Sequence, residues 1–357
     1  MIVARQERSM PVSHATAWDH LPDGRPLHRW TLRNAAGAQV EISDLGGTLL
    51  SWQVPDRQGR LGEVLLGHAT AQQYLDSNAY MGGIVGRWAN RIRGGRFRLD
   101  GIDYRVDRND GGNHLHGGTD GFHRQRWDVE SDDGGLLLRL VSPEGDGGFP
   151  GEVRVELRVR LDDDGALDLR YAATSDAPTP LSLTAHPYFN LNDRRPDIRD
   201  HVIRIDADAF LAIDAGAIPV GRQEVAGSAF DFREAAPIGS RLHWPDPQLR
   251  LVGGFDHCYV PRGEAGAGPR VVAVVTEPSS GRRLTVETDR PGLQFYSGQK
   301  LTGQPGRHGD MYGPFAGFAL ETQAFPDQVN GPDAEGAILR PGTVWRQHTR
   351  YRIDTAG

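Results

Sequence analysis

Cysteine and lysine are almost absent from this sequence of 357 residues. The single cysteine, Cys258, cannot form a disulfide within the chain, so a reducing compartment such as the cytoplasm is expected. One cysteine also excludes every Cys-x-x-Cys metal site. Lys300 is the only lysine and follows Gln299 in "GQKLTG", which excludes a P-loop, because that motif needs Gly before its lysine. A pyridoxal-dependent enzyme would have to use this one lysine.

Long apolar runs and an excess of positive charge are missing as well. No stretch approaches the roughly 20 apolar residues of a transmembrane helix, and the first residues contain no run long enough for a signal-peptide core. Lysine and arginine together number 40 against 47 acidic residues, which gives a formal net charge of −7. This balance argues against a nucleic-acid-binding protein. We therefore expect a cytoplasmic protein that binds neither nucleic acid nor a membrane.

Turn signals between alternating strands are abundant instead. Asp-Gly or Asn-Gly pairs are candidate tight turns, and they begin at Asp23, Asp100, Asp110, Asp120, Asp133, Asp146, Asp164 and Asn330. The stretch "RFRLDGIDYRV" (96–106) alternates on both sides of Asp100-Gly101, which predicts a β-hairpin. Only "ATAQQYLDS" (69–77) indicates a helix, and "GEAGAGPR" (263–270) is interpreted as a long hairpin loop.

These patterns predict an all-β chain folded as a large antiparallel β-sandwich with very little helix. We expect one domain from residue 15 to residue 357. Residues 1–14, ahead of that pattern, are expected to form a poorly ordered N-terminal extension.

Two segments near the first third of the chain carry polar groups suited to binding. In "GRWANRIRGG" (86–95), Asn90 and Arg91 precede a Gly-Gly turn, which is either a solvated hairpin end or an arginine fork for hydroxyl groups. In "GGNHLHGGTDGFH" (111–123), alternation places His114 and His116 on one side of an extended segment. With Asp120 and His123 nearby, this segment could hold a metal ion, line a polar substrate pocket or simply be a loop.

Three later segments add further candidates. "LSLTAHPYFNL" (181–191) places His186, Tyr188 and Asn190 on one strand face, and structural and functional interpretations are both open. "GGFDHCYV" (253–260) places Asp256 and Cys258 on one face, where a turn residue is the default interpretation of Asp256 and inert burial that of Cys258. "ALETQAFPDQVN" (319–330) puts Glu321 inside an apolar run, where a charge is costly unless it is paired or used in chemistry.

Taken together, these segments resemble the aldose 1-epimerase (galactose mutarotase) family. The matching pieces occur in the family's order and are "GRWANRI", "NHLHGG", "AHPYFNL", "GFDHCYV", "LQFYSG" and "ALETQAFPDQVN". The resemblance covers about residue 15 to the C-terminus and implies the galactose mutarotase-like supersandwich fold. It implies interconversion of the α and β anomers of a free aldose, such as galactose or glucose, without metal or cofactor. Pro187 and Cys258 depart from the family pattern, where serine and asparagine are common.

Matched by position, the resemblance implies that Glu321 is the general base and His186 the general acid. It also implies a set of sugar-binding residues, namely Arg91, His116, Asp256, Asn90, Gln294 and Tyr188. An aromatic platform for the sugar ring is expected from Tyr188, Trp88 or Tyr296. The expected partner is a small sugar, and a monomer and a homodimer are both open.

Other functions remain as alternatives. Glu321 and Asp256 could form the carboxylate pair of a glycoside hydrolase. A non-catalytic carbohydrate-binding or sensing protein is the second alternative, since a sandwich fold alone does not prove activity. An epimerase for a pentose or a modified sugar is the third.

Overall fold

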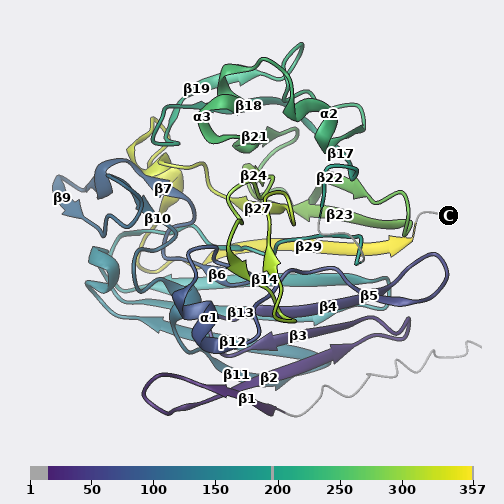
Figure 1. Cartoon of the computed structure of the whole chain (residues 1–357). Coiled ribbons are helices and arrows are strands. Elements are labelled where there is room, and N and C mark those ends of the chain that lie inside the picture. The colour runs from purple at the N-terminus through teal and green to yellow at the C-terminus, as the bar shows by residue number, and fades with distance from the viewer. Residues whose placement is uncertain (1–14, 194–196, 356–357) are drawn as a thin grey trace, which may run out of the picture.

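Antiparallel strands dominate the computed structural model, which describes residues 15–193 and 197–355 (Figure 1). The expected extension, residues 1–14, lies outside this described part. One five-stranded sheet has the order β1 (Thr16–His20), β2 (Pro26–Arg33), β3 (Gln39–Ser43), β4 (Leu49–Pro55) and β5 (Leu61–Glu63). A second has the order β19 (Pro219–Glu224), β18 (Ala207–Ile213), β21 (Asp256–Pro261), β24 (Gly292–Tyr296) and β27 (Ala319–Gln323).

The largest sheet has nine strands. Their order is β11 (Asp128–Asp132), β12 (Gly135–Ser142), β13 (Val153–Leu161), β14 (Ala166–Ser175), β29 (Trp345–Thr355), β23 (Arg282–Thr288), β22 (Arg270–Thr276), β17 (Val202–Ile205) and β20 (Ala236–Pro237). Short two-stranded ladders fill the connections, and they are β10 (His114–Leu115) with β7 (Arg91–Ile92), β8 (Arg96–Leu99) with β9 (Ile102–Arg105), β15 (Thr179–Pro180) with β28 (Ile338–Leu339), β16 (Thr184–Ala185) with β6 (Ile84–Val85), and β25 (Gln304–Pro305) with β26 (Met311–Tyr312). The predicted antiparallel sandwich is confirmed.

Helix is scarce, and the described residues contain three short α-helices. The predicted one is α1 (Ala71–Asp76), where Thr70 and Gln73 form a reciprocal capping box. The sequence analysis missed α2 (Ile238–Leu242) and α3 (Pro247–Val252), because five or six residues are too few to show helical periodicity. No helix in the described part is long and apolar enough to cross a membrane.

Two predicted turns had different outcomes. The hairpin of β8 and β9 is confirmed, and both Asp100 and Gly101 take positive φ, as the turn of a two-residue hairpin requires. The prediction of a hairpin loop at 263–270 is wrong. This segment joins β21 to β22, which belong to two different sheets, so it crosses between layers.

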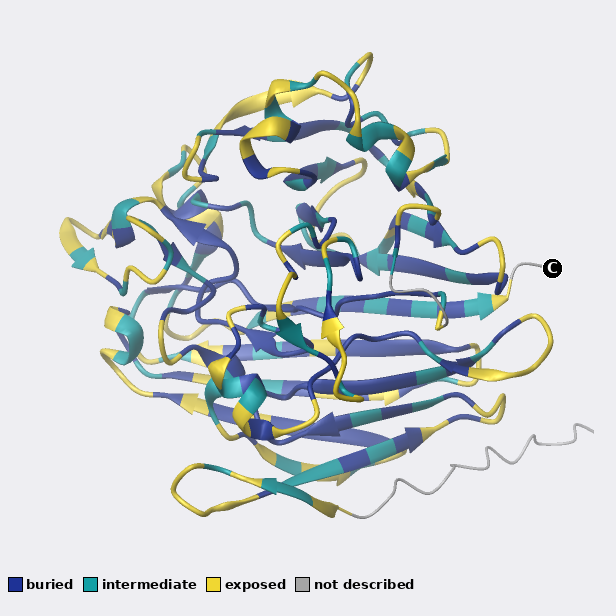
Figure 2. Cartoon of the chain, in the orientation of Figure 1, coloured by how far each residue is buried: buried dark blue, intermediate teal, exposed yellow. Residues whose placement is uncertain are grey.

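A single apolar cluster connects the sheets. It contains Trp52 of the first sheet, Leu138 and Leu157 of the nine-stranded sheet, and Leu293 and Phe295 of β24. Figure 1 places β2, β3 and β4 alongside β12, β13 and β14, and Figure 2 shows these strands mainly buried, with exposed residues concentrated in the connecting turns. The packed layers supply the rigid frame on which the site is built.

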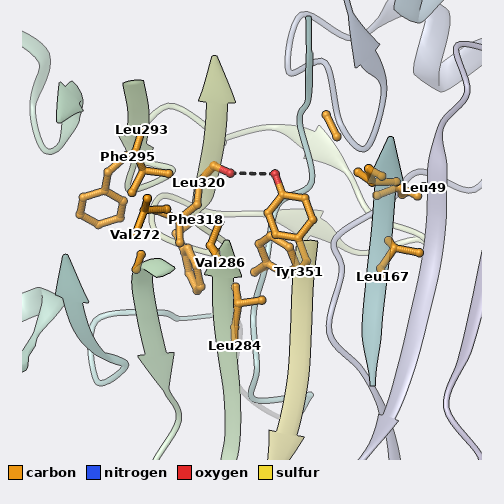
Figure 3. Packing of buried hydrophobic residues seen from close by; sticks show 14 of the residues in the cluster. Leu49, Leu167, Val272, Leu284, Val286, Leu293, Phe295, Phe318, Leu320 and Tyr351 are labelled. Atoms are coloured by element: carbon orange, nitrogen blue, oxygen red, sulfur yellow. Dashed lines mark hydrogen bonds between the residues drawn. The ribbon is translucent and has the colours of Figure 1, made fainter. Parts of the chain in front are cut away.

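Strand β27 is fixed in this frame by its apolar face. Leu320 packs among Phe318, Val286 and Tyr351, and the Tyr351 hydroxyl donates to the Leu320 carbonyl oxygen at 3.0 Å (Figure 3). Successive side chains of a strand point to opposite faces. Burial of Leu320 therefore turns Glu321 the other way.

Candidate active site

The side of β27 that carries Glu321 faces a cavity of about 360 Å³. Segments distant in sequence contribute its lining, which consists of Asn78, Ala79, Tyr80, Asn90, Arg91, Asp110, Leu115, His116, His186, Tyr188, Asp256, Tyr296, Lys300, Leu301, Gln304 and Glu321. Seven of the eight predicted site residues are in this set. A larger surface groove of about 680 Å³, lined by residues such as Leu21 and Val141, contains none of them.

Glu321 lies at the buried end of this cavity. Its side chain is 2% exposed, and Oε1 lies 3.5 Å from His186 Nε2. Among the described residues, Oε2 of Glu321 has no hydrogen-bond partner. Burial raises the pKa of Glu321 well above its ordinary value, and the negative charge of Asp256 raises it further, while Arg91 lowers it.

His186 lies directly after β16 and is buried beside Glu321. Its ring packs against those of Tyr188 and His116, with centroids 4.9 and 5.3 Å away. Burial lowers the pKa of His186 to about 4, although Asp256 acts in the opposite direction. Burial therefore disfavours the charged forms of both Glu321 and His186.

Polar side chains surround this pair. Arg91 Nε donates to Asp110 Oδ2 at 2.7 Å, and no described group accepts a hydrogen bond from the two terminal amino groups of Arg91. Asp256 Oδ1 accepts from Gln294 Nε2 at 2.7 Å. Gln294 is the one predicted site residue that does not line the cavity, and it lies behind Asp256.

Asn90 lines the cavity and is held by two hydrogen bonds that involve main-chain N–H groups. Its Oδ1 accepts from the main-chain N–H of Arg91 at 2.9 Å. Its own main-chain N–H donates to His116 Nδ1 at 3.2 Å.

Two details of the sequence analysis are wrong. His116 lines the cavity, but His114 does not, and it packs on Phe149 with its Nδ1 2.9 Å from the Asp107 carbonyl oxygen. Alternation fails there because His116 leaves the extended conformation, at φ +52°. Trp88 is fully buried in a core cluster and cannot be a sugar platform, whereas Tyr188 and Tyr296 line the cavity.

Sequence reasoning also missed several lining residues. Tyr80 is the most informative, because its ring lies 4.5 Å from that of His116 and its φ of +55° is rare for a bulky residue. Asp110 was noticed only as a turn residue. Asn78 and Lys300 come from loops and Gln304 from the short strand β25, and no sequence pattern there marks a site.

One set of side chains has metal-ligand chemistry. Ligand atoms of His116, His186 and Glu321 all lie within 4.8 Å of one another. Two imidazoles and a carboxylate are a known zinc ligand set. However, the N–H of Asn90 occupies Nδ1 of His116, so the nitrogen that faces the cavity bears hydrogen and donates. The set fits hydrogen bonding to a ligand better than coordination, and the expectation of no metal stays a prediction.

Comparisons with known proteins agree with this geometry. Residues 28–352 match the family described as aldose 1-epimerase. The chain is 41% identical to the aldose 1-epimerase of Escherichia coli K12 over 93% of this chain and 96% of that protein. It is 39% identical to the galactose mutarotase of Homo sapiens over 89% of this chain and 92% of that protein.

Solved structures give the same result. The galactose 1-epimerase of Lactobacillus acidophilus superposes with a TM-score of 0.85 at 29% sequence identity, covering 97% of this chain and all of that one. Sequence and structure agree over nearly the full length, and the chain belongs to the aldose 1-epimerase family.

Proposed function

We propose that this chain interconverts the α and β anomers of a free aldose, with Glu321 as base and His186 as acid. Family membership makes it an isomerase that acts on carbohydrates. The observation that carries the residue assignment is the 3.5 Å separation of Glu321 Oε1 and His186 Nε2 at the buried end of a polar cavity. Glu321 Oε2 and His186 Nδ1 have no hydrogen-bond partner in the part of the chain that the structure describes, and such a buried carboxylate and imidazole are suited to exchanging protons with a ligand.

The chemistry needs one proton acceptor and one donor at different sugar atoms. Glu321 removes the proton from the anomeric hydroxyl while His186 donates one to the ring oxygen, and the C1–O5 bond breaks. The open-chain aldehyde rotates about C1–C2. Closure reverses both transfers on the other face of C1, so the sugar is isomerised and the protein is returned unchanged.

The charge arrangement is adjusted by the neighbours of the pair. Arg91 lowers the pKa of Glu321, so it favours the carboxylate that the base role needs. Asp256 raises the pKa of His186, which favours the protonated acid. A sugar that fills the cavity and orients these groups would thus work with the protein to move the proton from Glu321 to His186.

Other lining residues are suited to recognising sugar. The terminal amino groups of Arg91 and the carboxylate of Asp256 match the hydroxyl groups of an aldose. The rings of Tyr188 and Tyr296 give apolar surface for the sugar ring. Gln294 is assigned a supporting role, because its amide is bonded to Asp256.

Galactose and glucose are the substrates we propose first, because the relatives bear the names aldose 1-epimerase and galactose mutarotase. We also propose a single domain over residues 15–357, which the continuous apolar cluster supports. A cytoplasmic monomer or homodimer that uses no cofactor and binds no nucleic acid completes the proposal. The net charge of −7 supports the last point.

Polarimetry tests the proposal. Freshly dissolved α-D-galactose, α-D-glucose, arabinose and xylose are each followed with wild-type protein and with Glu321→Gln. We expect one or more sugars to equilibrate far faster than in buffer, and the variant to lose this effect. Wild-type rates no faster than buffer for all four sugars would contradict the proposed activity, whereas equal rates for the variant would contradict the assigned base.

A further inference from the structure

The two imidazoles of the site differ in one main-chain contact. The N–H of Asn90 donates to His116 Nδ1 at 3.2 Å, and the N–H of His116 donates to the Asn90 carbonyl oxygen at 3.1 Å. These reciprocal bonds clasp His116 onto a single residue of the neighbouring segment. His186 is also held by main-chain hydrogen bonds, but none of the described main-chain N–H groups donates to its ring, and its Nδ1 has no hydrogen-bond partner among the described residues.

The clasp depends on unusual backbone conformations. Asn90 has φ +67° and His116 has φ +52°, both in the left-handed region that most residues avoid. Each conformation costs free energy and persists only because the surroundings enforce it, as is common at functional sites. Around Asn90, the Arg91 N–H bonds its side chain, and the paired strands β7 and β10 lie immediately adjacent. Tyr80 packs on the His116 ring from the other side, with centroids 4.5 Å apart.

We propose that the main-chain N–H of Asn90 locks His116 in the neutral tautomer with hydrogen on Nε2, which makes it a fixed hydrogen-bond donor to the sugar. An amide N–H can only donate, so Nδ1 must carry the lone pair, and the hydrogen of the neutral ring lies on Nε2. His116 then cannot be the acid of the reaction. The proton that reaches the ring oxygen comes from His186 alone.

Burial and the basic groups around His116 oppose its protonation. The groups that face it are Arg91, His186, His123, His114, Tyr80 and Glu321. Burial lowers the pKa of His116 well below its ordinary value, and the positive forms of His186, Arg91, His123 and His114 lower it further. Of the facing groups, only Glu321 carries an acidic carboxyl, and burial keeps its pKa high. Geometry and electrostatics therefore favour the same neutral ring.

This inference rests on the proposed function for its consequence and deepens it by separating the roles of two histidines. A neutral donor stabilises negative charge that develops on a sugar oxygen, without exchanging a proton. His186, free of a main-chain donor, remains able to gain and release one. Two histidines whose rings lie 5.3 Å apart thus perform different tasks.

Nitrogen-15 NMR of the ligand-free protein tests the tautomer directly. The signals of His116 are assigned as those that vanish in His116→Gln. We expect the pattern of a neutral ring protonated on Nε2, unchanged across the neutral pH range. A ring protonated on Nδ1, or one that becomes charged in this range, would overturn the inference. Because this readout needs no turnover, an inactive protein with the expected tautomer would contradict the proposed function alone.

A matched pair of variants tests the donor role. The side chain of His116→Gln can place an amide N–H near the position of Nε2, whereas the shorter side chain of His116→Asn reaches only the position of Nδ1, where its oxygen can accept from the Asn90 N–H. Loss of one preorganised donor typically costs about a hundredfold or more in rate. We expect His116→Asn to mutarotate sugar at least about tenfold more slowly than His116→Gln. Equal rates for the two variants would overturn the donor role.

Asn90→Gly is the control for the clasp. Glycine keeps the main-chain N–H and adopts positive φ without strain, but it removes the side chain. We expect the His116 tautomer to be unchanged in this variant. A changed tautomer would overturn the assignment of the lock to the Asn90 main chain.

Discussion

Two buried glutamates of this molecule differ in their hydrogen bonding, and their pKa values shift in opposite directions. Glu277 and Glu321 are each 2% exposed. Glu277 accepts hydrogen bonds from Ser279 N–H and Oγ–H and from Ser280 N–H, between 2.6 and 3.0 Å. Burial raises its pKa, but these bonds outweigh burial and lower it to about 2. No described residue donates such hydrogen bonds to Glu321, so burial dominates and its pKa rises.

A pair of arginines four residues apart repeats the contrast. Arg87 is buried and donates to Ser142 and to the carbonyl oxygens of Ser142, Pro143, Pro150 and Gly151. Arg91 is almost as buried, yet among the described residues only Asp110 accepts from its side chain. A buried polar group that the protein fully satisfies is structural. One left unsatisfied beside a cavity is available to a ligand.

The largest effect is expected at the glutamate that lacks partners. Glu321→Gln should reduce mutarotation by about 10⁴-fold, because an amide cannot accept the proton, and acid–base groups contribute about 10²–10⁴-fold. Its free energy of unfolding should hardly change. Glu277→Gln is the matched control and should retain full activity. Polarimetry and chemical denaturation of both variants check the contrast, which fails if Glu277→Gln loses comparable activity.

The next largest effect is expected on stability, at Arg87. Arg87→Met should lower the free energy of unfolding by about 3 kcal/mol, because several buried carbonyl oxygens lose their donor. The remaining folded protein should still turn over sugar. Urea denaturation measures the loss, and an unchanged midpoint would show that the arginine is not a structural anchor.

Arg91→Met should give the opposite pattern. Loss of charge-assisted hydrogen bonds to sugar, each about 1.5–3 kcal/mol, should lower kcat/KM by about 10–100-fold. Stability should change little, since only the partly exposed pair with Asp110 is lost. If Arg91→Met unfolds as readily as Arg87→Met, the distinction between the two arginines is wrong.

The smallest effect is the acid sensitivity conferred by Glu277. Its folded pKa of about 2 lies below the ordinary 4.5, so it stabilises the fold above about pH 4.5 and this contribution disappears as pH falls toward 2. The free energy of unfolding of the wild type should exceed that of Glu277→Gln near neutral pH. The gap should close on acidification, as followed by denaturant midpoints. A gap that is independent of pH would contradict this explanation.

The sequence predicted strands, hairpins and most of the site, because alternation and Asp-Gly turns are local signals. Glu321, His186 and Arg91 were identified through motifs whose order matches a family, and the fold brings them to one cavity. Alternation failed at His116, since a positive φ cannot be read from a histidine in a glycine-rich segment. Tyr80 and Asp110 were missed because a loop residue becomes part of a site only through long-range packing. For the same reason, the sequence does not reveal that residues 263–270 connect strands of two different sheets.

The central claim is that Glu321 and His186 act as one unit on one sugar. The most direct test compares the mutarotation rates of Glu321→Gln, His186→Gln and the double variant. Substitutions of groups that act together have strongly non-additive effects on rate. Removing the second group therefore slows the reaction little once the first has been removed. We predict that the double variant is about as slow as the slower single variant. Losses that multiply, so that each residue contributes independently of the other, would contradict the account.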